Sequence, residues 1–147
     1  MSMHRRPLGR GRTMAAIGGG LMVVGCVLPW WKVGGTPGIP AASGNGLAGA
    51  GILVFLVGIA SVALVALPYA TGDRPVSLDR WLSFALLAVA GWVGFVWRVV
   101  ELALYGAFQF RAPLEVFADG PGLWIAALGL VVLSRATYTM TREPAYR

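Results

Sequence analysis

Two ionisable residues lie within an apolar run of this sequence, and they are the first candidates for chemistry. Arg98 and Glu101 are three residues apart in the run Trp81–Leu104, so on a helix they share a face and can form an ion pair. At about 1.5 Å per residue, Arg98 lies roughly 26 Å along that run. The pair either anchors a helix end by neutralising itself or contacts a ligand, an ion or a partner. Tyr105, one turn further on, can join either arrangement.

The residues that enzymes require are sparse. Membrane hydrolases and transferases need a nucleophile with its base, a carboxylate pair or a metal cluster. His4 is the one histidine and Cys26 the one cysteine, which excludes a disulfide within the chain, a cysteine-cluster metal site and a buried imidazole for haem. Asp73 and Asp79 each have an arginine beside them that they neutralise. We therefore predict no enzyme activity, no metal and no cofactor.

Cys26 has two interpretations. The letters VVGC, after an arginine-rich start and an apolar stretch, match a relaxed lipobox. Cleavage there would remove the first apolar run and leave a lipidated cysteine. The apolar run continues through Trp31, however, where a lipoprotein would turn polar, and this favours ordinary packing of Cys26 within a helix.

Four apolar runs must position all of these residues. Hydrophobic residues make up 57% of the 147 residues and charged residues 12%, against about 25% charged in soluble domains. A hydrocarbon core of about 30 Å needs on the order of 20 apolar residues in a helix. The sequence therefore predicts transmembrane helices at about 14–31, 47–67, 81–104 and 121–138. Short joints make successive helices antiparallel neighbours, so we expect an all-α, up-down bundle over residues 14–138, between tails at 1–13 and 139–147.

The net charge of +6 follows the topology of such a bundle. Nine of the twelve basic residues lie in the first, third and last polar segments: Arg5, Arg6, Arg10, Arg12, Arg74, Arg80, Arg135, Arg142 and Arg147. By the positive-inside rule, both termini are then cytoplasmic. The basic surplus faces anionic lipid, and nucleic acid is not an expected partner. Eleven arginines against one lysine suggest a GC-rich bacterial genome and hence a bacterial cytoplasmic membrane.

The ends of the helices are predicted from capping residues and prolines. We expect N-caps at Thr13, at Ser43 or Asn45, and at Asp119, helix ends at Leu28 and Pro68, and a first helical residue at Pro121. The Gly- and Pro-rich segment 30–46 is predicted to be an irregular external loop. The segment 105–120 is more apolar and is predicted to lie in the membrane interface as a short amphipathic piece.

Small and aromatic residues indicate how the helices are covered. Contact faces between helices are predicted at Ala16 and Gly20, Gly51 and Gly58, and Gly122 and Ala126. Interface anchors are predicted at Trp30, Trp31, Lys32, Trp81 and Trp124. Trp92 lies in the middle of its run, where an indole N–H requires a partner, so we expect it to face the bundle or a neighbouring subunit. Trp97 is a second candidate for contact with a partner.

The end of the first run also carries a resemblance. The letters LPWW at residues 28–31, a Gly-rich loop, and a second run that starts with GLAGAG at residues 46–51 resemble small uncharacterised four-span membrane proteins of GC-rich, actinobacterial-like bacteria. The likeness covers the first half of the chain and implies no activity.

Together these features favour a non-catalytic accessory or assembly subunit. Its expected partners are the lipid bilayer and other membrane subunits or further copies of itself. The alternative is a small oligomeric channel or transporter with Arg98 and Glu101 at its outer mouth. A polar pathway needs more than one polar group near the middle of the membrane, and at that depth the first, second and fourth runs offer only Ser61 and backbone.

Overall fold

The computed structural model describes residues 9–70, 81–108 and 114–143. In chain order these residues form α1 (Arg10–Val27), β1 (Pro29–Val33), β2 (Ala42–Asn45), α2 (Gly51–Ala70), α3 (Trp81–Leu104), α4 (Glu115–Asp119) and α5 (Pro121–Arg142). The predictions for the basic residues at 1–8, for the joint at 71–80, for Arg111 and for Arg147 lie outside the described residues.

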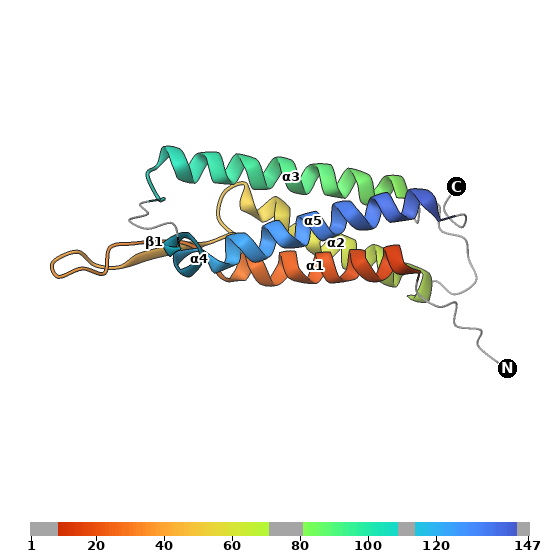
Figure 1. The fold of residues 1–147 in the computed structure, drawn as a ribbon, viewed down its shortest axis with the longest axis horizontal. Helices are drawn as coiled ribbons and strands as arrows, with labels where there is room; N and C mark the ends of the chain where they lie inside the picture. Colours follow the sequence, from red (N-terminus) through yellow and green to blue (C-terminus); the bar gives the residue numbers. More distant parts are fainter. Residues whose placement is uncertain (1–8, 71–80, 109–113, 144–147) are drawn as a thin grey trace.

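Four long helices run up and down beside one another (Figure 1). The helix α1 packs against α2 and α5, and α3 packs against the same two helices from the other side. The start of α1 and the end of α5 lie at one end of the bundle, and the hairpin β1–β2 extends from the opposite end (Figure 1). The mostly helical fold confirms that part of the prediction, whereas the hairpin has no place in an all-α class.

Three of the described helices are long and apolar enough to cross a membrane: α2, α3 and α5. The helix α1 is shorter, with 18 residues, and has arginine at its first and third positions. It starts at Arg10 with Gly9 as its N-cap, so the prediction of Thr13 as N-cap is wrong. Arginine is a good helix former, and the carboxylate of Glu143 accepts a hydrogen bond from the N–H of Gly11 at 3.2 Å, which stabilises the earlier start.

The helix α1 ends at Val27, with Leu28 as its C-cap, which agrees with the predicted end near Leu28. The segment 29–45 is a β-hairpin rather than an irregular loop, because β1 and β2 pair in an antiparallel ladder with a bulge near its start. Aromatic and β-branched residues in β1 favour strand geometry. The rings of Trp31 and Trp30 lie where side chains on Gly44 and Gly46 would stand, so these glycines are required for the hairpin to close on its aromatic strand.

Both proposed caps of α2 are wrong, because Ser43 and Asn45 lie within β2 and the helix begins at Gly51. The side-chain oxygen of Asn45 accepts instead from the N–H of Leu47 at 3.2 Å. This bond shapes the turn that leads from the hairpin into α2, a common role for asparagine.

Two other helix ends differ from prediction. The helix α2 continues to Ala70 with Pro68 inside its last turn, where the missing N–H of proline removes one helical hydrogen bond. Asp119 ends α4 rather than capping α5, whose N-cap is Gly120 without a side-chain bond. Pro121 is the first residue of α5, as predicted.

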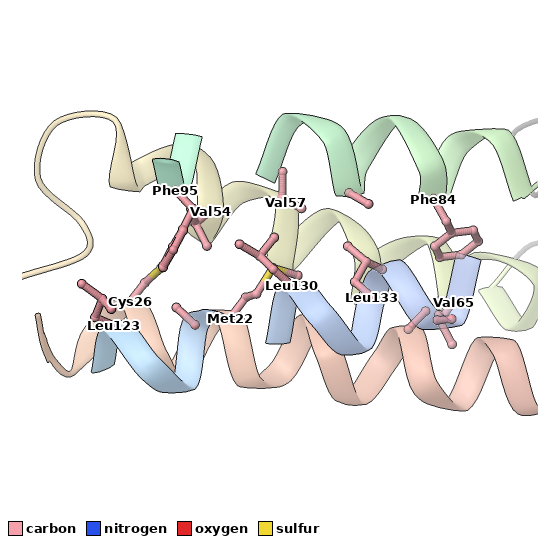
Figure 2. Close-up of a cluster of buried hydrophobic side chains, with 14 of the residues drawn as sticks. Met22, Cys26, Val54, Val57, Val65, Phe84, Phe95, Leu123, Leu130 and Leu133 are labelled. Carbon is pink, nitrogen blue, oxygen red and sulfur yellow. The ribbon is translucent and has the colours of Figure 1, made fainter. Parts of the chain in front are cut away.

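The core consists of apolar side chains from all four long helices, which meet along the axis of the bundle (Figure 2). Its fully buried members include Met22 and Cys26 of α1, Val54 of α2, Phe84 of α3 and Leu130 of α5.

The contact between α1 and α5 is built on small residues seven apart. We call this contact the glycine seam; its members are Gly11, Gly18 and Gly25 of α1, with Gly122, Gly129 and Ala136 of α5. A Cβ on Gly18 would lie 2.8 Å from the carbonyl oxygen of Gly129, and one on Gly25 would lie 2.5 Å from the backbone nitrogen of Ala126. Backbone therefore packs directly on backbone along the antiparallel pair.

The predicted small-residue faces are partly confirmed. Gly122 lies in the glycine seam and Ala126 lies beside it. Gly58 packs against α1, where a Cβ on Gly58 would lie 2.9 Å from the carbonyl oxygen of Gly19. Gly20 was placed on the wrong face, because nothing lies within 4 Å of the position of its Cβ. The position of a Cβ on Gly51 faces the preceding turn at Gly46, while the carbonyl oxygen of Gly51 lies 3.9 Å from Sγ of Cys26 in α1.

Candidate functional site

The ion pair on α3 forms near the C-terminal end of that helix. The Nη1 group of Arg98 donates to Oε2 of Glu101 at 2.6 Å, across the one-turn spacing of the two residues. Arg98 is buried, with 9% of its surface exposed, while Glu101 is half-buried. A charge at this depth is stable only with its partner, so the two side chains act as one unit.

The turn between the hairpin and α2 covers this pair. Gly49, in that turn, has a positive φ of +58°. A Cβ on Gly49 would lie 2.8 Å from Nη1 of Arg98 and 2.9 Å from Oε2 of Glu101. Gly94 brings the backbone of α3 close to the same turn. A Cβ on Gly94 would lie 3.1 Å from the carbonyl oxygen of Ala50. Glycine at these positions thus allows the chain to close over the charges.

Arg98 also carries an unmet hydrogen-bond donor. Its Nε is buried and has no acceptor within the described part of the chain. A buried donor without an acceptor costs roughly 1–3 kcal/mol. Among the described residues, the guanidinium is therefore held by its charge-assisted bond to Glu101.

The arginine of this pair is suited to holding an anion rather than to accepting a proton. An arginine does not deprotonate in proteins, so it cannot act as a general base. A guanidinium can hold a carboxylate or a phosphate, but Glu101 already fills that role here. The pair is built to fix the end of α3 against the turn at Gly49, and an external anion would have to displace Glu101.

Aromatic rings pack beside the pair, towards the middle of the bundle. Trp30 has 1% of its surface exposed, and its indole N–H donates to the carbonyl oxygen of Gly25 at 2.9 Å. Its ring lies 5.5 Å from that of Phe95, which in turn meets Trp92 edge-on at 5.9 Å. This cluster joins the base of the hairpin to α3.

Trp92 finds its hydrogen-bond partner within the same chain. Its indole N–H donates to the hydroxyl of Ser134 on α5 at 3.0 Å. The ring is half-buried between α3 and α5. Of the two settings considered for Trp92, the structure therefore places it towards the bundle interior.

Trp97 and Tyr105 point the other way. Trp97 is 68% exposed and Tyr105 is 80% exposed. Tyr105 meets Glu101 only through a backbone bond, from its N–H to the carbonyl oxygen of Glu101 at 3.0 Å. The candidates on α3 and just after it thus divide into an inner group of Trp92, Arg98 and Glu101 and an outward pair, Trp97 and Tyr105.

The residues considered as interface anchors also divide. Trp30 is in the core, so its ring does not reach the outer surface of the bundle. Trp31 is half-buried and covers Gly44. Lys32, Trp81 and Trp124 are on the surface, and the ring of Trp124 lies 4.8 Å from that of Phe117 on α4.

Cys26 is buried between α1 and α2, with its Sγ 3.9 Å from the carbonyl oxygen of Gly51. Cleavage before this residue would remove nearly all of α1, and with it the glycine seam. The position of Cys26 is that of an ordinary small core residue.

Several residues that shape the site were not singled out from the sequence. Gly49 covers the ion pair, Ser134 accepts from Trp92, and Gly25 positions α1. The spacing of Gly11, Gly18 and Gly25 by seven residues was a visible signal for a helix contact. Nothing local in the sequence marks Gly49 or Ser134, since their roles depend on contacts with distant segments.

Fold and site define a small helical bundle with a covered ion pair at the hairpin end. Among the described residues, no three His, Cys, Asp or Glu side chains are grouped so that they could hold a metal ion. Comparison with protein-family models, with curated proteins and with solved structures gave no match.

Proposed function

We propose that this chain is a four-span protein of a bacterial cell membrane, with both ends on the cytoplasmic side, that serves as a non-catalytic accessory or assembly subunit. The observation that carries the proposal is the outward face of α3. Large apolar side chains are exposed along its whole length: Leu82, Leu86, Val89, Val93, Val96, Trp97, Val100 and Leu104. A continuous apolar surface of this kind is rare on proteins in water and marks contact with lipid or with another protein.

A fourth crossing by α1 is supported by its packing. The glycine seam aligns α1 with α5, and α5 is one of the helices long and apolar enough to cross a membrane. The strand β1 then extends the apolar column beyond the end of α1. The N–H of Gly46 donates to the carbonyl oxygen of Cys26 at 2.9 Å, so the backbone remains paired where helix gives way to hairpin, as an apolar environment requires.

The interior of the bundle favours assembly over conduction. Among the described residues, the buried polar or charged side chains are Ser61 and Arg98. The hydroxyl of Ser61 donates to the carbonyl oxygen of Val57 in its own helix at 2.7 Å. A water-filled or ion-conducting path through a single copy would need polar groups at several depths. In this proposal the protein therefore acts through contacts made by the outer surface of the bundle.

The accessory role is tested by site-specific photo-crosslinking in the native membrane. The photoreactive phenylalanine analogue benzoylphenylalanine replaces Trp97 in one variant and Leu86, an equally outward residue of α3, in a matched control. We expect position 97 to give one discrete protein adduct, either a second subunit or another copy, and position 86 to give lipid adducts. A chain that purifies alone as a monomer, with lipid adducts at both positions, would refute the accessory role.

Topology is tested separately by cysteine labelling in a Cys26→Ala background. Cysteines introduced at Lys32 and at Arg142, both exposed, lie at opposite ends of the bundle. We expect a membrane-impermeant maleimide to label position 32 in intact cells and position 142 only after permeabilisation. The reverse pattern would overturn the orientation, and labelling of both in intact cells would overturn the four crossings.

The channel alternative has its own assay. Reconstituted liposomes are expected to show no solute or ion flux above that of empty liposomes. Flux that disappears in Arg98→Ala would replace the accessory role by a conduit that uses the pair at its mouth.

A further inference from the structure

One outward-facing stripe of side chains on α5 changes from apolar to basic along the helix. Its members are spaced by three and four residues and are all exposed: Leu128, Val131, Arg135, Tyr138 and Arg142. This spacing places them on a single face of the helix. The stripe is apolar towards the middle of the bundle and becomes basic and aromatic at the end where α1 begins (Figure 1).

Two arginines of the stripe are held on one ring. The guanidinium carbons of Arg135 and Arg142 lie 5.3 Å and 4.7 Å from the centre of the Tyr138 ring, within the range of cation–π attraction. Arg142 also donates from Nη2 to the hydroxyl of Tyr138. Tyr138 therefore brings two positive groups together on an exposed surface, although like charges repel.

The described residues leave the positive charge of Arg135 and Arg142 without a paired carboxylate. The nearest acid along the chain, Glu143, directs its Oε1 to the N–H of Gly11 at the start of α1. The start of α1, at Arg10, lies at the same end of the bundle (Figure 1), so this arginine adds to the positive potential there.

We propose that Arg135, Tyr138 and Arg142 bind the phosphate of an anionic phospholipid whose acyl chains lie along Leu128 and Val131. Guanidinium groups bind phosphate through paired, charge-assisted hydrogen bonds. The apolar half of the stripe matches the acyl chains, which a soluble phosphate lacks. This inference rests on the membrane placement proposed above, and it adds a specific lipid site to it.

The test uses full-length protein in vesicles of phosphatidylcholine with an equal amount of phosphatidylglycerol. After gentle release into detergent, native mass spectrometry measures the fraction of protein that retains one phosphatidylglycerol molecule. Each basic residue near a membrane surface contributes about 1 kcal/mol to binding anionic lipid, so we expect R135Q and R142Q each to lower the retained lipid roughly fivefold. Y138L is expected to lower it as well, because it removes the ring that holds both arginines, while Y138F has a smaller effect.

Matched controls separate a site from diffuse charge. R10Q removes an exposed arginine at the same end, and K32Q removes an exposed lysine at the other end. We expect K32Q to leave the retained lipid unchanged, and R10Q, which contributes only to the general positive potential of that end, to lower it clearly less than R135Q or R142Q does. Equal losses for R10Q and R135Q would overturn the site in favour of general attraction, and wild-type protein that retains no phosphatidylglycerol would overturn it outright.

Flotation of the same vesicles separates a failure of the lipid site from a failure of the proposed membrane location. Protein that floats with the vesicles but shows no preference between the two lipids refutes the lipid site alone. Protein that fails to float refutes the membrane placement.

Discussion

The bundle is held together in different ways on its two sides. Between α1 and α5, the glycine seam removes side chains so that the backbones touch. Around α3, the contacts are made by large side chains, by the ring cluster of Trp30, Phe95 and Trp92, and by the covered ion pair. A contact between backbones has no side chain that can move aside, whereas rings and long side chains can repack. The first side should therefore tolerate almost no added volume, and the second should tolerate conservative exchange.

This difference also suggests that the α1–α5 side holds the bundle together, while the α3 side offers a surface for other molecules. Lipid provides no hydrophobic drive for helices to associate, so close approach through small residues is an efficient source of stability within a bilayer. The helix α3 keeps its large apolar side chains on the outside, where they are free to meet lipid or another protein.

The largest effect is expected from Gly18→Val. A Cβ at this position would lie 2.8 Å from the carbonyl oxygen of Gly129 and 2.9 Å from the backbone nitrogen of Leu133, so the helices must separate. Overpacking of this kind costs typically 1–3 kcal/mol, and more where backbone must move. We expect a loss of about 3 kcal/mol, measured by reversible unfolding in mixed micelles.

Gly20→Ala is the matched control for the glycine seam. Gly20 lies two residues away on the same helix, with nothing within 4 Å of its Cβ position. Since alanine favours a helix over glycine by roughly 0.5–1 kcal/mol, stability should stay equal or rise slightly. A loss in Gly20→Ala as large as in Gly18→Val would show that glycine content, and not the seam, sets the stability of α1.

The apolar runs and their order could be predicted from the sequence because hydrophobicity and length are local properties. The end of α1 near Leu28 was predictable for the same reason, since Pro29 restricts the residue before it. The hairpin was missed because Gly- and Pro-rich letters resemble a loop, and its pairing depends on Trp30 and Trp31 covering glycines more than ten residues away. The early start of α1 was missed because its stabilising carboxylate, Glu143, comes from the far end of the chain.

The next largest loss of stability is expected from Glu101→Gln, at the ion pair on α3. Glu101→Gln leaves the guanidinium of Arg98 buried without a countercharge. Breaking one partner of a fully buried pair costs about 3–5 kcal/mol, and the half-exposed carboxylate here reduces this to about 2 kcal/mol. The double variant Arg98→Met with Glu101→Gln removes both charges and should recover most of that loss. A double variant less stable than Glu101→Gln alone would show that the pair is a net source of stability.

A smaller effect is expected from Gly49→Ala, which tests the cover over the pair. The positive φ of +58° costs an alanine roughly 1–2 kcal/mol, and the added methyl meets Nη1 of Arg98 at 2.8 Å. A Cβ on Gly49 would also lie 2.9 Å from Oε2 of Glu101. In a background with both Arg98→Ala and Glu101→Ala these contacts are gone, so the cost of Gly49→Ala should fall to the backbone part alone. Thermal unfolding of the four proteins in detergent measures this coupling, and equal costs in both backgrounds would place the turn away from the ion pair.

The candidate site was predictable only in part, for a physical reason. The three-residue spacing of Arg98 and Glu101 is local, and it marked the pair in the sequence. The direction in which α3 presents each face is set by packing against α2 and α5, so the sequence alone did not separate the inward Trp92 from the outward Trp97. Gly49 has its role only because the chain returns over α3 after the hairpin.

The smallest effect tests the hydrogen bond that links α3 to α5. The hydroxyl of Ser134 accepts from the indole N–H of Trp92 at 3.0 Å and donates to the carbonyl oxygen of Leu130 at 2.9 Å. Ser134→Ala should cost about 0.6 kcal/mol, the average for hydrogen bonds between membrane helices. Thr137→Val is the matched control, because the hydroxyl of Thr137 donates at 3.0 Å to Leu133 of its own helix. If unfolding in micelles shows equal losses for the two variants, the bond between Trp92 and Ser134 adds nothing to this contact, and the α3 side is held by its rings and its ion pair.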